Sequence, residues 1–182
     1  MKTLPPEILR AMQARATRAS ITSSSMRGAG SSGVVAAGQV FLCQVDLRAF
    51  GLAHVTRFRT QLDATTTAFV RALPKPARHW GLARKGLNIF LRECLYMVYL
   101  REHYGLERAE RFLEIPLDSV TGQALHRASD GALPRWATVR GLQSDVSDQF
   151  QLFAAKLARK KGIARIHLDA IWWGERSRDA DV

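Results

Sequence analysis

The chain of 182 residues contains only two cysteines, Cys43 and Cys94, which lie far apart and form no CxxC pair. Zinc or iron–sulfur ligation by cysteine requires more sulfur ligands than this. The two residues are instead typical of small buried side chains in a reducing compartment. We therefore expect neither a metal site nor a cofactor.

Long apolar runs are also absent. No stretch approaches the roughly 18 uninterrupted apolar residues that a membrane span needs, and the longest apolar segment contains Asn88, Arg92 and Glu93. The first six residues lack the hydrophobic region of a secretory signal, and no Gly-x-Ser-x-Gly nucleophile elbow is present. These absences predict a cytoplasmic protein with no membrane partner and no serine nucleophile of the elbow type.

Acidic residues are fewer than basic ones, with 16 Asp and Glu against 27 Lys and Arg and a formal net charge of +11. A domain this basic attracts polyanions. Nucleic acid is the usual partner, because phosphate contacts dominate the affinity of such surfaces. A membrane surface, an acidic protein or a generally arginine-rich proteome are the alternative explanations of the charge.

The apolar residues, 47% of the chain, recur mostly at helical spacing, without internal repeats or alternating strand patterns. We therefore expect an all-α, compact helical domain. Helices are expected at residues 4–19, 34–44, 54–73, 80–104, 107–113, 118–127 and 145–161. Gly105 is a plausible helix C-cap, and residues 163–173 fit either an extended segment or a last helix.

Composition changes abruptly at residues 20–33, where Ser and Gly dominate. Such a segment is typical of a flexible linker or loop. The alternative is that its backbone amides, together with Arg27, cradle a phosphate. We expect residues 1–33 to form an N-terminal helix and a Ser/Gly-rich segment, and residues 34–182 to form the helical nucleic-acid-binding or catalytic domain.

Two short motifs carry the functional interpretation. The first is Gly81-Leu82-Ala83-Arg84-Lys85, and the second, Pro116-Leu117-Asp118-Ser119-Val120, places Asp118 33 residues after Lys85. A lysine amine of lowered pKa can attack a sugar carbon, and a carboxylate stabilises the positive charge that builds on the sugar. Arg84, next to Lys85, is expected to lower the lysine pKa. The alternative is a solvated Lys85 and an Asp118 that only caps a helix.

These motifs resemble those of the helix-hairpin-helix DNA glycosylase superfamily. Endonuclease III-like members carry a Gly-x-Gly-x-Lys hairpin, and the longer spacing here is similar to that of the archaeal 8-oxoguanine glycosylase branch. The resemblance covers roughly residues 80–125, with Ala83 in place of the second hairpin glycine and without the four-cysteine cluster. It implies a helix-hairpin-helix-like element with Gly81 in the hairpin, Lys85 as catalytic lysine and Asp118 as catalytic aspartate.

Further site residues follow from the hairpin, the charge and the aromatic residues. The expected nucleic acid contacts are Gly81, Ala83, Arg84, Arg92, Arg135, Lys160 and Lys161. The expected base pocket consists of Trp80, Tyr96, Tyr99 and Trp136. Trp172 and Trp173 are further stacking candidates, and core packing is the alternative for at least two of the four tryptophans.

The leading prediction is a DNA N-glycosylase, with or without lyase activity at abasic sites, that acts on double-stranded DNA through Lys85 and Asp118. The first alternative is a non-catalytic, basic nucleic-acid-binding subunit of a larger assembly, in which Lys85 contacts a phosphate. The second alternative is a helical protein-interaction subunit with an acidic partner.

Overall fold

The computed structural model describes residues 4–29, 32–51 and 54–179, with side chains as far as Gly174. Across these ranges the regular structure consists of α-helices and short 3-10 turns, without strands. The prediction of an all-α domain is thus confirmed. None of the described helices combines the length and the apolar character needed to cross a membrane.

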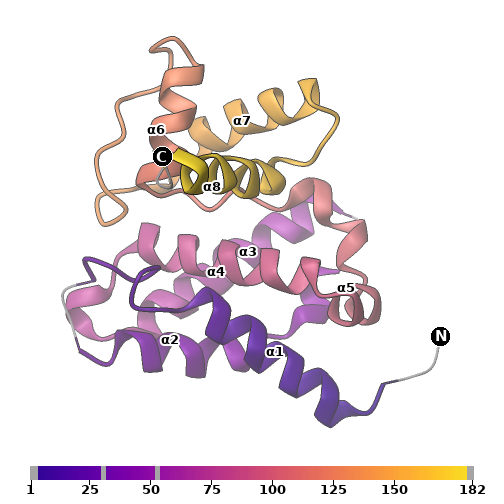
Figure 1. The fold of residues 1–182 in the computed structure, drawn as a ribbon. Coiled ribbons are helices and arrows are strands. Elements are labelled where there is room, and N and C mark those ends of the chain that lie inside the picture. Colours follow the sequence, from indigo (N-terminus) through magenta and orange to yellow (C-terminus); the bar gives the residue numbers. More distant parts are fainter. Residues whose placement is uncertain (1–3, 30–31, 52–53, 180–182) are drawn as a thin grey trace.

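Figure 1 shows the helices in two layers, one above the other. The first layer contains α1 (Pro6–Ser20), α2 (Val34–Cys43), α3 (Val55–Ala72), α4 (Trp80–Tyr96) and α5 (Val98–Tyr104). The second layer contains α6 (Ser119–Ala128), α7 (Ser144–Lys160) and α8 (Leu168–Asp179). Residues 113–117 lead from the first layer to the second.

Each layer has an apolar core of its own. In the first layer α4 packs against α1, α2 and α3, and the buried side chains around it include Phe58, Phe69 and Phe90. The second layer is smaller, and its buried side chains include Leu125 and Phe150. Hydrophobic burial therefore stabilises each layer.

The helices begin and end close to the residues expected from the sequence, with one break that the sequence did not indicate. Residues 80–104 form two helices, because Met97 adopts an extended conformation between α4 and α5. The break allows Leu95 and Leu100, on either side of it, both to be buried. Gly105 ends α5 in the left-handed region at a φ of 68°, as expected of a C-cap.

The structure corrects one expected helix and settles one segment that the sequence left open. Residues 107–113, expected as one short helix, form two 3-10 turns at Leu106–Arg108 and Glu110–Phe112. Residues 163–173, for which an extended segment or a helix was open, contain a 3-10 turn at Arg165–His167 followed directly by α8.

The described part of the Ser/Gly-rich segment, residues 20–29, is a loop packed against the first layer, so the alternative of a flexible linker is wrong there. The side chains of Ile21, Met26 and Ala29 are buried in the first core. Thr22 and Ser25 stabilise the turn between them, since the hydroxyl of each accepts a hydrogen bond from the other's amide, at 2.9 and 3.1 Å. Residues 30 and 31 lie outside the described residues.

The helix-hairpin-helix element expected around Gly81 is not confirmed. α4 already begins at Trp80, so Gly81 and Lys85 both lie in its first two turns. A Cβ atom on Gly81 would stand 2.2 Å from the carbonyl oxygen of Val139 and 2.7 Å from Cβ of Leu142. The glycine therefore allows the loop around residue 139 to approach α4 closely, and this loop covers it.

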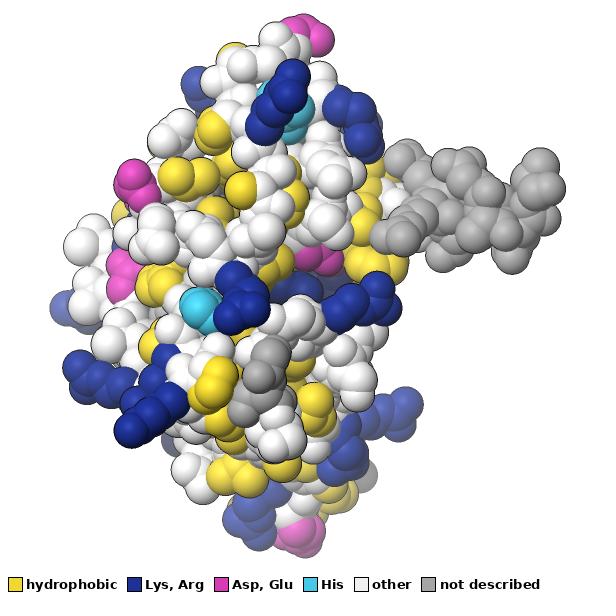
Figure 2. Space-filling view, turned by 90° about the vertical axis from the view of Figure 1, so that its left-hand side faces the viewer, with side chains coloured by type: hydrophobic (Ala, Val, Ile, Leu, Met, Phe, Trp, Pro, Cys, Tyr) yellow, Lys and Arg dark blue, Asp and Glu magenta, His cyan; other side chains and the backbone are white. Residues whose placement is uncertain are grey.

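Basic side chains are visible on the face that shows both layers. Figure 2 shows Lys and Arg gathered across the middle of this face, beside a hollow at the level where the layers meet. Basic side chains beside a hollow raise the local concentration of polyanions there.

Candidate active site

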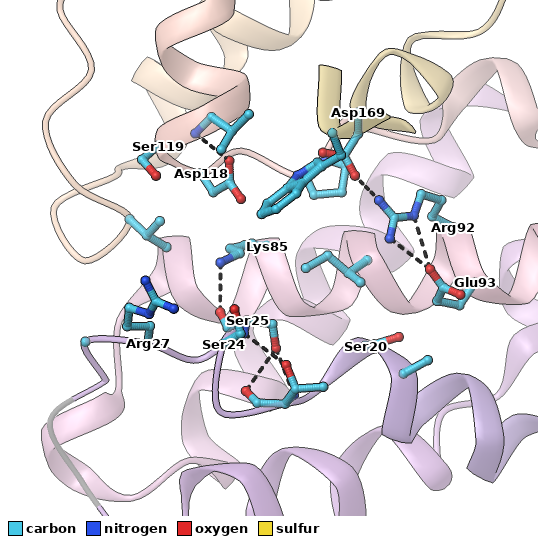
Figure 3. Close-up of a pocket in the computed structure, with 18 of the residues that line it drawn as sticks. Ser20, Ser24, Ser25, Arg27, Lys85, Arg92, Glu93, Asp118, Ser119 and Asp169 are labelled. Carbon is cyan, nitrogen blue, oxygen red and sulfur yellow. Dashed lines mark hydrogen bonds and ion pairs between the residues drawn. The ribbon is translucent and has the colours of Figure 1, made fainter. Parts of the chain in front are cut away.

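A cavity of about 990 Å³ lies between the two layers. Its walls come from α4, from residues 19–28, from residues 116–120 at the start of α6, from the loop of residues 136–140 and from α8. Figure 3 shows Lys85 and Asp118 facing one another in the middle of this cavity. Two residues that the sequence separates by 33 positions are thus brought to one site from different layers.

Lys85 is partly buried in the cavity wall formed by α4. Its Nζ donates a hydrogen bond to the backbone carbonyl oxygen of Ser25 at 2.7 Å. Burial lowers the pKa of Lys85 below its ordinary value, the negative charge of Asp118 opposes this effect, and the positive charge of Arg27 adds to it. The neutral, nucleophilic amine is therefore more accessible near neutral pH than in a solvated lysine.

Asp118 is the N-cap of α6. Its Oδ1 accepts hydrogen bonds from the backbone amides of Val120 and Thr121, at 2.9 and 3.0 Å. No described residue bonds to Oδ2, and the carboxylate faces Lys85 (Figure 3). The same residue thus fixes the start of a helix with one oxygen and can present the other to a developing positive charge.

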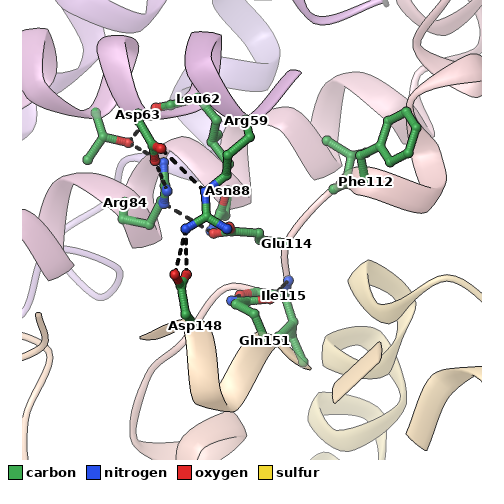
Figure 4. A network of polar contacts seen from close by, with 12 residues as sticks. Arg59, Leu62, Asp63, Arg84, Asn88, Phe112, Glu114, Ile115, Asp148 and Gln151 are labelled. Atoms are coloured by element: carbon green, nitrogen blue, oxygen red, sulfur yellow. Dashed lines mark hydrogen bonds and ion pairs between the residues drawn. The ribbon is translucent and has the colours of Figure 1, made fainter. Parts of the chain in front are cut away.

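Arg84 does not act on Lys85 as expected from the sequence. Figure 4 shows it within a polar network that joins the layers. Its side chain is 2% exposed, Nε lies 3.1 Å from Oε2 of Glu114, Nη2 pairs with Asp63, and Nη1 donates to Thr66 at 2.8 Å. The cation that lowers the pKa of Lys85 is Arg27.

Three residues that were expected to contact phosphate are buried, so this expectation is wrong for them. Gly81, Ala83 and Arg84 are all buried, and Arg84 already has carboxylate partners in Asp63 and Glu114. A phosphate cannot reach these side chains without displacing the loop around residue 139 or breaking a buried ion pair.

Arg92 lines the cavity but is also engaged. Nη2 lies 2.8 Å from Oε1 of Glu93, and Nη1 pairs with Asp169, whose side chain is 3% exposed. Figure 3 shows these three residues at the opposite end of the cavity from Arg27. The expectation that Arg92 contacts a phosphate is corrected, because two carboxylates surround its guanidinium group.

The aromatic residues expected in a base pocket divide into two groups. Trp136 and Tyr96 line the cavity, whereas Trp80 and Tyr99 do not. The ring of Trp80 lies under the guanidinium of Arg84, 5.0 Å from its Cζ, and Tyr99 is exposed on α5. Trp173 of α8 supplies a third aromatic side chain to the cavity.

Tyr96 is held at the cavity rim by a short chain of polar groups. Its hydroxyl lies 2.9 Å from Nδ1 of His167, and Nε2 of His167 lies 2.8 Å from Oε1 of Glu110. The two rings are stacked, with centroids 5.6 Å apart. Burial raises the pKa of Tyr96, so that its hydroxyl stays protonated.

The remaining basic candidates are exposed but lie outside the cavity lining, namely Arg135, Lys160 and Lys161.

The sequence interpretation missed Ser24, Ser119, Arg140 and Asp169, all of which line the cavity. A composition dominated by Ser and Gly gave no indication that residues 20–29 pack against Lys85. Arg140 and Asp169 lie in segments whose positions depend on tertiary packing.

No group of three or more His, Cys, Asp or Glu side chains suited to a metal ion occurs among the described residues. Comparison of the chain with protein-family models, curated proteins and solved structures gives no match. The functional argument consequently depends on the chemistry of the cavity.

Proposed function

We propose that the protein is a DNA N-glycosylase in which Lys85 is the nucleophile and Asp118 its electrostatic partner. The observation that supports the proposal is the meeting of these two side chains in one interlayer cavity, where burial lowers the pKa of the lysine. The resemblance of the two motifs to helix-hairpin-helix glycosylases supports the same assignment, although the hairpin itself is not confirmed.

The proposed reaction begins with the neutral amine of Lys85. Its nitrogen attacks C1′ of the sugar, the bond from C1′ to the base breaks, and the base leaves with the electron pair and takes up a proton. A proton then passes from the amine nitrogen to the ring oxygen, the bond from C1′ to that oxygen breaks with its electron pair on oxygen, and the nitrogen lone pair forms the C=N bond of a Schiff base between Lys85 and C1′. The carboxylate of Asp118 stabilises the positive charge on the sugar during the displacement.

The proposed substrate is double-stranded DNA, from which the modified nucleotide is extruded into the cavity. The net charge of +11 and the basic side chains beside the hollow (Figure 2) support a polyanionic partner. Tyr96, Trp136 and Trp173 line the cavity, and bases stack on aromatic side chains of this kind. We place this activity in the cytoplasm, as the sequence predicts.

Borohydride trapping tests the proposal on duplexes that carry 8-oxoguanine, uracil or an abasic site. We expect an adduct with a modified-base duplex that Lys85→Gln abolishes and Lys156→Gln retains, because Lys156 is exposed on α7 and outside the cavity. Abasic sites react with exposed lysines in general, so only an adduct with a duplex that carries 8-oxoguanine or uracil tests the proposal.

Release of the base without an adduct would leave a glycosylase that uses water as nucleophile. If no duplex gives an adduct or a released base while DNA binding remains salt-sensitive, the proposal is wrong. That result would support the non-catalytic nucleic-acid-binding subunit instead.

A further inference from the structure

α4 runs along the cavity and defines the order of its polar groups. Lys85, Arg92 and Tyr96 all face the cavity from this helix, and with a rise of 1.5 Å per residue Lys85 and Tyr96 are about 16 Å apart along the axis. Each of the three contacts a different partner from another part of the chain. The partners can therefore be placed along the cavity by the α4 residue that they contact.

The N-terminal end of α4 is surrounded by cations. The loop that carries Arg140 packs on Gly81 through Val139, and Nε of Arg140 lies 3.2 Å from Nε2 of His79, the N-cap of α4. One turn further along, Arg27 lies close enough to Lys85 to lower its pKa.

Arg27 and Arg140 are both exposed cavity-lining residues, and no described carboxylate pairs with either. Asp118 is the anionic side chain that lines this end of the cavity. Two guanidinium groups therefore remain available for an external anion at the cavity mouth.

The other end of the cavity has the opposite character. Arg92 is flanked by Glu93 and Asp169, so that two negative charges surround one positive charge. Beyond them Tyr96 presents an aromatic ring, and Trp173 lines the same cavity from α8. A phosphate is disfavoured at this end, whereas a flat, neutral base with N–H donors is compatible with the carboxylates and the rings.

We propose that the cavity binds one extruded nucleotide in a fixed direction, with an adjacent backbone phosphate held by Arg27 and Arg140 and the base directed toward Tyr96 and Trp173. This inference rests on the proposed function, because it takes an extruded nucleotide as the ligand. In this arrangement the sugar lies between the two ends, where Lys85 faces Asp118 (Figure 3). Arg27 and Arg140 would take the role of phosphate contact that the sequence assigned to Gly81, Ala83 and Arg84.

Equilibrium binding tests the phosphate end without requiring any base release. The probe is a fluorescein-labelled duplex with one tetrahydrofuran abasic analogue, measured by anisotropy between low and moderate salt. We expect Arg27→Gln and Arg140→Gln each to weaken binding about fivefold and to reduce the salt slope by about one. Arg10→Gln is the matched control, since Arg10 is exposed on α1 and outside the cavity.

A neutral methylphosphonate in place of the phosphates beside the analogue should remove the difference between the parent and Arg27→Gln. Equal effects of Arg27→Gln, Arg140→Gln and Arg10→Gln would overturn the phosphate assignment. This experiment measures affinity for a duplex that has no base to release at the analogue. The phosphate assignment can therefore be confirmed even if the glycosylase proposal is wrong, and it can be wrong even if base release is observed.

Photocrosslinking tests the direction of the base. A duplex with 5-iodouracil at an unpaired central position is irradiated with the parent protein, and the modified peptide is identified by mass spectrometry. We expect the adduct on the peptide that contains Tyr96 or Trp173. An adduct within residues 20–28 or 136–140, or none at either aromatic residue, would overturn the proposed direction.

Discussion

Asp118 and Thr121 form a reciprocal pair at the start of α6. Oδ1 of Asp118 accepts from the amide of Thr121 at 3.0 Å, while the hydroxyl of Thr121 accepts from the amide of Asp118 at 2.9 Å. This pair fixes the position of the carboxylate that faces Lys85. Helix capping and the proposed catalysis therefore depend on the same side chain, and suitable substitutions can separate the two roles.

We expect Asp118→Asn to keep the stability of the protein but to lose most base release. Asparagine caps a helix about as well as aspartate, whereas alanine costs about 1 kcal/mol at this position. In urea unfolding, the parent and Asp118→Asn should have the same free energy of unfolding, and that of Asp118→Ala should be lower. In the base-release assay, by contrast, Asp118→Asn should fall well below the parent. Full base release by Asp118→Asn would contradict the electrostatic role.

The pH at which Lys85 becomes reactive should depend on its two charged neighbours. Burial lowers the pKa of Lys85, and Asp118 opposes this effect while Arg27 adds to it. The amine is protonated below this lowered pKa and becomes reactive as the pH rises through it. We expect Asp118→Asn to move the reactivity profile to lower pH and Arg27→Gln to move it to higher pH.

Reductive methylation at a series of pH values, followed by mass spectrometry of the Lys85 peptide, measures this profile without DNA. Lys156 provides an internal control within the same sample, because it is exposed and outside the cavity. If Lys85 and Lys156 react with the same profile in the parent, the lowered pKa is refuted.

Breaking the buried ion pair between the layers should destabilise the protein strongly. The side chains of Arg84 and Glu114 are each 2% exposed. In Arg84→Met the buried carboxylate of Glu114 loses this cation and keeps the hydrogen bond that Asn88 donates to it at 3.3 Å. We expect a loss of about 3–5 kcal/mol, typical of a buried charge that loses its partner.

The exposed pair of Arg59 and Asp148 provides the comparison. Because both side chains are more than 40% exposed, Arg59→Met should cost only about 0–1 kcal/mol. Urea unfolding of both variants measures the difference, and equal costs would show that burial is not the cause.

Gly122→Ala should change the shape of the cavity by displacing the side chain of Trp136. A Cβ atom on Gly122 would stand 2.3 Å from the indole ring of Trp136, and Trp136 lines the cavity. Overpacking of this kind costs about 1–3 kcal/mol, and we expect altered tryptophan fluorescence together with weaker DNA binding. Unchanged fluorescence and unchanged DNA binding in Gly122→Ala would contradict this prediction.

Local patterns predicted the helices well because their signals lie within a few residues. The N-cap at Asp118, the C-cap at Gly105 and the apolar spacing of α4 are of this kind. The Met97 break has no comparable local signal, since it depends on where Leu95 and Leu100 must be buried.

The assignment of Arg84 failed for a geometric reason. Successive residues in a helix differ by about 100° around the axis, so neighbours in sequence face different directions. Arg84 consequently points to Asp63 and Glu114, while Lys85 points into the cavity. The partner of Lys85 comes from a segment 60 residues away in sequence, at Ser25, which no local pattern identifies.

The contact between Ile21 and Gly86 has an evolutionary consequence. A Cβ atom on Gly86 would stand 3.1 Å from Cδ1 of Ile21 and 3.2 Å from the ring of Phe69. Related chains that carry alanine at position 86 should therefore carry a smaller residue, such as valine, at position 21. Correlated variation at these two positions would record that the Ser/Gly-rich segment and the lysine helix have been inherited as one packed unit.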